Sequence, residues 1–232
     1  MPTLAEALAI LEQHYGPQQP TFPTDPYDFL IWWHCGYPAS DAACNRGWHS
    51  LTGSLRIDPS TLLHTSEAKL TTLLQPGGMV PELRARRLHE IAHRVLNQCN
   101  NDLRFALAAL PLKDARRLLK SFPNIADPGA DRILLFAGLA PLAAVPSNAP
   151  QVAVRIQLGA EHESYATTYR EAQSLIDSQI PAHFDARTRA FLLFKHHGET
   201  LCKRTKPKCP LCPLQPTCAY AQGHTRGRHT RP

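Results

Sequence analysis

The stretch CKRTKPKCPLCPLQPTC, Cys202–Cys218, places four of the chain's seven cysteines within seventeen residues. Six, two and five residues separate them in turn. Four thiolates from so short a loop can converge on one centre, as zinc and iron–sulfur clusters both require. One pair of cysteines is separated by two residues, which favours zinc. A zinc ribbon, however, usually contains two pairs with this spacing, and the other gaps here are longer. The stretch therefore predicts a metal centre and leaves its kind open.

The remaining cysteines, Cys35, Cys44 and Cys99, are scattered and odd in number, which does not fit a secreted disulfide framework. The chain has 232 residues and is 43% hydrophobic, enough to bury the core of one or two domains. It contains no apolar run near the roughly 18 residues of a membrane span, and its N-terminus lacks the order of a signal peptide. We expect a cytoplasmic protein with no membrane association.

The net charge is +6 and the sequence pI is about 9.0. A basic surface attracts polyanions, because each phosphate contact releases counterions. The charge balance is compatible with nucleic acid as a partner but does not identify one.

Helical periodicity dominates the chain. The segments 81–98 and 111–122 carry Leu, Ile and Val at three- and four-residue spacing, with Arg and Lys on the other face. Each begins with proline, which suits the first position of a helix. The segment 25–51 suggests an apolar helix, a turn at GYPAS and a second helix. No alternating strand pattern is evident, so we predict an all-α fold of many short helices.

The longer segment HHGETLCKRTKPKCPLCPLQPTC, residues 196–218, resembles the C-terminal iron–sulfur loop of the endonuclease III branch of helix-hairpin-helix DNA glycosylases. That loop runs H-G-x3-C-x6-C-x2-C-x5-C, and His197 and Gly198 match its start. The resemblance implies a [4Fe–4S] cluster bound by Cys202, Cys209, Cys212 and Cys218. It also implies DNA contact by the basic residues of the first gap, which are Lys203, Arg204, Lys206 and Lys208.

A second segment, LLKSFPNIADPGADRILLFAG, Leu118–Gly138, is similar to the family's hairpin L-P-G-V-G-x-K-T-A, whose backbone holds a DNA phosphate. The family's two glycines, which normally allow a positive φ, are replaced here. Asn tolerates that conformation better than Ala does. The resemblance implies phosphate contact through Pro123, Asn124, Ile125 and Ala126, with Gly129 able to take over part of the task.

Upstream, residues 29–51 resemble the family's apolar helix, lesion-facing loop and S-x-D-x3-N helix start, with Asp41 and Asn45 matching. Tyr37 lies in the loop that in the family fills the hole left by a flipped base. Its ring either stacks on DNA there or packs within the turn. The resemblance covers roughly residues 25–220.

The catalytic positions depart from the family. The lysine that forms a Schiff base in bifunctional members aligns with Pro128, and the family's carboxylate aligns with Pro146. Proline offers neither an amine nor a proton acceptor. Asp127 and Asn148 are the nearby candidates for altered chemistry, although each is also suited to a helix cap or turn. Lys120, at the end of a helix, is the nearest lysine.

We therefore expect a two-lobed helix-hairpin-helix glycosylase fold with a C-terminal iron–sulfur loop. The helical barrel lobe with the hairpin would span 25–138, and the cluster lobe would combine 1–24 with 139–232. The expected function is that of a monomeric protein that repairs double-stranded DNA through altered, monofunctional glycosylase chemistry without lysine-dependent lyase activity. The alternatives are a non-catalytic protein that binds damaged DNA and a cluster-based redox sensor.

Overall fold

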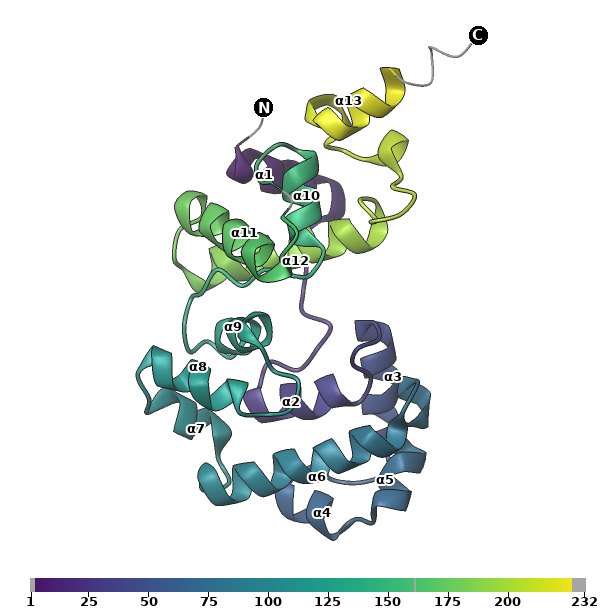
Figure 1. The fold of residues 1–232 in the computed structure, drawn as a ribbon, viewed down its shortest axis with the longest axis vertical. Coiled ribbons are helices and arrows are strands. Elements are labelled where there is room, and N and C mark those ends of the chain that lie inside the picture. Colours follow the sequence, from purple (N-terminus) through teal and green to yellow (C-terminus); the bar gives the residue numbers. More distant parts are fainter. Residues whose placement is uncertain (1–2, 161, 227–232) are drawn as a thin grey trace. The chain divides into compact units, whose positions relative to one another are not determined.

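The computed structural model describes residues 3–160 and 162–226, and the regular elements in these ranges are all helices. This confirms the all-α prediction for the described chain. The helices group into two compact units (Figure 1). We call Pro20–Ala140 the hairpin unit, and Met1–Gln19 together with Pro141–Pro232 the cysteine unit.

The hairpin unit contains eight α-helices and one 3-10 turn. In chain order they are α2 (Pro26–His34), α3 (Asp41–Thr52), α4 (Pro59–His64), α5 (Glu67–Leu74), η1 (Gln75–Gly77), α6 (Pro81–Gln98), α7 (Leu103–Ala108), α8 (Leu112–Lys120) and α9 (Asp127–Phe136). The predicted helix over 81–98 is α6. The second predicted helix is shorter than 111–122, because Pro111 is the N-cap of α8 and lies before its first turn.

Aromatic side chains fill the centre of the hairpin unit. Phe29 and Trp32 of α2 are buried, and the Phe22 ring packs edge-on against Phe29 and Phe136. The Arg132 guanidinium of α9 lies 3.9 Å from the centre of the Phe22 ring. A cation over an aromatic face is favourable, so this contact joins α9 to the aromatic core.

The cysteine unit combines the N-terminal helix with the elements that follow Pro141 (Figure 1). Its elements are α1 (Leu4–Tyr15), α10 (Ala149–Arg155), α11 (Tyr165–Gln179), α12 (Phe184–Thr200), η2 (Cys209–Leu211), η3 (Gln215–Thr217) and α13 (Ala219–Arg226). A capping box between Thr3 and Glu6 starts α1, which gives its first turn the hydrogen bonds that a helix end otherwise lacks.

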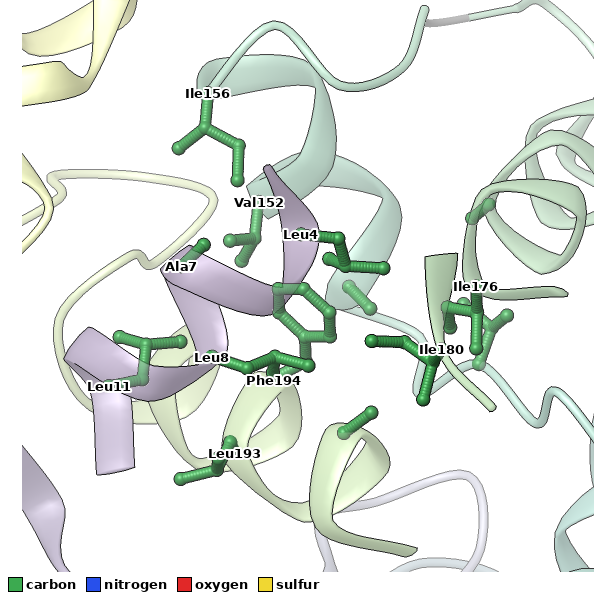
Figure 2. Packing of buried hydrophobic residues seen from close by; sticks show 14 of the residues in the cluster. Leu4, Ala7, Leu8, Leu11, Val152, Ile156, Ile176, Ile180, Leu193 and Phe194 are labelled. Atoms are coloured by element: carbon green, nitrogen blue, oxygen red, sulfur yellow. The ribbon is translucent and has the colours of Figure 1, made fainter. Parts of the chain in front are cut away.

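One apolar core holds the cysteine unit together. Leu4, Leu8 and Leu11 of α1 pack with Val152 of α10 and Phe194 of α12, and Figure 2 shows these side chains pointing toward one another. Of the loop cysteines, Cys218 belongs to this core, and the other three are partly buried against it. The loop is therefore anchored on a surface that requires α1, which is nearly two hundred residues distant in the chain.

In the described ranges, no helix is long and apolar enough to cross a membrane.

Candidate nucleic-acid interface and metal centre

The turn between α8 and α9 provides the conformation that the hairpin needs without either family glycine. Asn124 has φ 53°, in the left-handed region that asparagine tolerates. Ala126 has φ −106° and ψ −175°, an extended conformation open to any residue. Gly129 lies within α9 and is not required for close packing, since a Cβ there would meet Ile125 at 3.5 Å. The glycine replacements are thus compatible with the turn.

The first turn of α9 presents backbone N–H groups. Ala126 is the N-cap residue, and no side chain caps the helix. Pro128 stands in the first turn, where its missing N–H removes one donor. The remaining N–H groups and the positive end of the helix dipole favour an anion at this position.

His34 fixes the hairpin to α2. Its ring nitrogens face two carbonyl oxygens, with Nδ1 2.7 Å from Leu30 O and Nε2 3.0 Å from Pro123 O. Burial lowers the pKa of His34 to about 4, so the ring is neutral near pH 7 and its single N–H donates to one of the two oxygens at a time. Pro123 opens the turn, and His34 is therefore a support for the hairpin that the sequence did not reveal.

Two carboxylates adjoin the hairpin, and their environments differ. The Asp131 side chain is fully buried, and Arg116 Nε donates to its Oδ1 at 2.6 Å. Asp127 is 60% exposed, and its Oδ1 lies 2.8 Å from Lys120 Nζ. Asp127 occupies the first position of α9 and pairs across the turn, where the sequence suggested a cap. Of these two carboxylates, only Asp127 is open to solvent.

The lesion-facing loop predicted around Tyr37 follows α2. The Tyr37 ring is half-buried and stacks on Trp33, with 4.3 Å between ring centres and 22° between planes. Asp41 at the start of α3 pairs with Arg132 at 3.1 Å, and Asn45 accepts from Trp32 Nε1 at 2.6 Å. The matched Asp and Asn thus support the fold of this region.

The four loop cysteines line one pocket. Its other walls include Arg155, Leu201 and Tyr220. Within the ranges that the structure describes, no three His, Cys, Asp or Glu side chains meet as the ligands of one metal ion. The pocket lining is Arg155, Leu201, Cys202, Pro207, Cys209, Cys212, Cys218, Tyr220 and Ala221.

Nitrogen atoms from outside the loop approach two of these sulfurs. Arg155 Nη1 of α10 lies 3.3 Å from Cys202 Sγ, and His197 Nε2 of α12 lies 3.7 Å from Cys212 Sγ. Burial raises the pKa of Cys202, and raises that of Cys212 to about 11, so both remain thiols near pH 7 unless a metal displaces the proton. Burial likewise lowers the pKa of His197 to about 4.

Arg155 also shapes the first gap of the loop. Its guanidinium donates to the carbonyls of Lys203 at 2.8 Å and Arg204 at 3.0 Å, and it lies 4.4 Å from the Tyr220 ring centre. The side chains of the gap remain exposed, namely Lys203, Arg204, Lys206 and Lys208.

The segment before α10 offers little reactive chemistry. Pro146 is buried, and Asn148 is the N-cap residue, but its side chain does not cap the helix. Instead Asn148 Nδ2 donates to Lys195 O at 3.0 Å, and a Cβ at Gly198 would come within 2.5 Å of the Asn148 side chain. The Asn148 amide thus packs on α12, which explains why glycine is needed at position 198.

No known family profile matches this sequence, and a comparison with curated proteins finds no relative. Solved structures do match the fold. A non-covalent complex of endonuclease III with DNA has a TM-score of 0.77 and 19% identity, covering 97% of this chain and all of that one. A thermostable thymine-DNA glycosylase has a TM-score of 0.71 and 17% identity, covering 95% of each chain.

A third structure is the 3-methyladenine DNA glycosylase of H. pylori bound to 1,N6-ethenoadenine. It has a TM-score of 0.57 and 16% identity, covering 86% of this chain and 95% of that one. The chain therefore has the fold of helix-hairpin-helix glycosylases, as the sequence motifs predicted. At these identities the likeness concerns the fold alone.

Proposed function

We propose that this chain binds double-stranded DNA and removes damaged or mismatched bases as a slow, monofunctional glycosylase of the base-excision-repair type. The observation that carries the proposal is the hairpin. Its turn keeps a left-handed residue at Asn124, and α9 begins without a side-chain cap. A DNA phosphate would complete the hydrogen bonding of this helix start.

The basic gap of the cysteine loop supplies a second group of phosphate contacts. Lys203, Arg204, Lys206 and Lys208 are exposed, and Arg155 holds the backbone beneath two of them. Replacing all four by Gln should weaken duplex binding and reduce the salt slope by up to about 0.9 log unit per lost contact. Fluorescence anisotropy over a salt series would measure both quantities. The control is Arg56→Gln with Lys69→Gln, two exposed residues of the hairpin unit.

We further propose that Cys202, Cys209, Cys212 and Cys218 hold a [4Fe–4S] cluster. Four thiolates on one zinc ion would each place sulfur about 2.3 Å from a single point. Here the four thiols surround a pocket, and two N–H-bearing side chains approach the sulfurs. Bound there, the cluster would hold the basic loop rigid. Purified protein should contain about four irons and four acid-labile sulfides, and stoichiometric zinc without sulfide would refute this.

The chemistry would rest on water. Water adds to the sugar C1′, the base leaves with the electrons of the glycosidic bond, and the proton of the water passes to an acceptor. Asp127 is the exposed carboxylate beside the hairpin and is our candidate for that acceptor. Lys120 is engaged by Asp127, and proline occupies both family positions for catalysis, so no lyase step is expected.

The chemical test uses single-turnover reactions on a panel of lesion-bearing duplexes. Base release should be slow, strand cleavage should need later alkali, and borohydride should trap no adduct. Asp127→Asn should lower the rate by about a hundredfold or more, as expected for loss of a catalytic base. Asp114→Asn is the matched control, because it removes another carboxylate that is paired with a basic side chain, that of Arg117.

The alternative is a protein that recognises damaged DNA without cleaving the glycosidic bond. Pro128 and Pro146 favour it, because proline stands at both positions where the family has catalytic side chains. Lesion-selective binding without base release from any duplex would establish it. An adduct that borohydride traps and that Lys120→Ala abolishes would instead show lysine-dependent lyase activity.

A further inference from the structure

A chain of polar groups crosses the interior of the cysteine unit and ends at a cysteine of the loop. His197 is 1% exposed. Its Nδ1 lies 2.8 Å from the hydroxyl of Tyr15, and its Nε2 lies 3.7 Å from Cys212 Sγ. Tyr15 is the last residue of α1, so this contact spans 182 positions of the sequence.

The direction of these hydrogen bonds follows from the chemistry of their ends. A neutral imidazole carries one N–H, on either nitrogen. A metal-bound thiolate accepts hydrogen bonds but has no proton to donate. His197 can therefore bond to a ligated Cys212 only through Nε2–H, which leaves Nδ1 as an acceptor.

Tyr15 provides the donor that this tautomer requires. Burial raises the pKa of the Tyr15 phenol, which keeps its proton near pH 7. Thr200 Oγ1 lies 3.3 Å from the Tyr15 oxygen and 2.7 Å from His196 O. The ring of His196 packs edge-on against the Tyr15 ring, with 4.6 Å between centres. The phenol is thus held with its hydroxyl toward His197.

We infer that Tyr15 is a positioning residue, which fixes the tautomer of His197 so that Nε2–H points at the sulfur of Cys212 and raises the reduction potential of the cluster. The inference rests on the [4Fe–4S] group of the proposed function. An N–H donor withdraws negative charge from the thiolate and stabilises the more negative, reduced state. A residue at the end of the N-terminal helix thereby tunes a centre held by the C-terminal loop.

The test measures reduction potential in the full chain. Tyr15→Phe removes the hydroxyl and keeps the ring. We expect the iron and sulfide content to persist and the potential to fall. We expect the reduction potential to fall by about 59 mV. For a one-electron couple, this is a tenfold change in the ratio of oxidised to reduced cluster at a fixed solution potential. Tyr165→Phe, at an exposed position of α11, is the control and should leave the potential unchanged.

A double-mutant cycle separates positioning from packing. His197→Phe should lower the potential, and Tyr15→Phe should add nothing in that background, because Tyr15 acts through His197. Additive shifts would overturn the inference. Pulsed EPR on the reduced proteins adds a second test, since the wild type should show an exchangeable proton coupled to the cluster that His197→Phe lacks, distinct from that of Arg155 Nη1 near Cys202 Sγ. Absence of that proton would also overturn the inference.

Failure of the proposed cluster is distinguishable from failure of this inference. Wild-type protein without iron and sulfide would refute the cluster, and the tuning role with it. Wild-type protein with the cluster, but with an unchanged potential in Tyr15→Phe, would refute the role of Tyr15 alone.

Discussion

The turn at 121–126 and the loop Cys202–Cys218 differ in which atoms would bind their partners. The hairpin offers backbone N–H groups, so its side chains can vary provided that φ and ψ are kept. Asn124 and Ala126 illustrate this, since one adopts the left-handed conformation and the other an extended one. The loop offers thiolate sulfur atoms, so its binding depends on the cysteine side chains themselves, and its four cysteines match the family spacing in full.

The same comparison separates binding from chemistry. Catalysis depends on side chains, as metal binding does. In this chain, however, the two positions that carry catalytic side chains in the family are occupied by Pro128 and Pro146. A backbone site tolerates that replacement, whereas a nucleophile or proton acceptor does not. The following predictions test this difference, beginning with the largest expected effect.

Cys209→Ser should abolish the metal centre, because serine oxygen is a poor ligand for iron. Iron and sulfide should be lost, and amide exchange should accelerate between Cys202 and Cys218. The hairpin unit should keep its protection. Cys99→Ser, at a buried position of the hairpin unit, is the control and should keep full iron content. Equal iron content in the two variants would contradict the ligand assignment.

Acid should weaken the support of the hairpin. Burial lowers the pKa of His34 to about 4, below its ordinary value of 6.5. The unfolded state therefore takes up a proton first as the pH falls, and stability is lost between pH 6.5 and 4. His34 should contribute about 2 kcal/mol of this loss between pH 7 and pH 5.

Urea unfolding at the two pH values would measure the loss. In His34→Gln, the free energy of unfolding should depend less on pH than in the wild-type protein. His64→Gln, at an exposed position, should keep the wild-type pH dependence. An equal pH dependence in wild type and His34→Gln would contradict a neutral, buried His34.

The two former glycine positions should respond in opposite ways. Asn124→Ala should cost about 1 kcal/mol, because alanine is strained at φ 53°. Asn124→Gly should be tolerated or slightly stabilising. Ala126→Gly should destabilise by roughly 0.5 to 1 kcal/mol, since the native backbone is extended and glycine only adds freedom to the unfolded chain. Thermal unfolding of the three variants would test this, and a gain in stability for Ala126→Gly would contradict it.

The smallest stability effect is expected at the ion pair across the turn. Lys120 and Asp127 are both exposed, so Lys120→Ala should cost roughly 0.2 to 1 kcal/mol, decreasing with added salt. Arg117→Ala breaks a similar exposed pair on α8 and should behave alike. A cost of several kcal/mol at Lys120 alone would show that the pair is required for the hairpin to fold.

The sequence by itself determined the helices and the two motifs. The segment 81–98 forms α6 because its apolar spacing fits one helical face and proline suits its start. The cysteine spacing and the FPNIA turn were visible for the same reason, since each depends on neighbours within a few residues. Pro111 shows the limit of such local patterns, because it lies just outside α8.

Only the tertiary structure decided how distant residues meet. It buried Asp131 and left Asp127 exposed, although they lie only about one turn apart in α9. It also brought Tyr15 to His197, and Arg155 to Cys202. Local propensities carry no information on such pairs, because a contact between remote residues follows from how whole helices pack. Tyr15 and His34, which support the candidate sites through such contacts, are therefore residues that sequence reasoning missed.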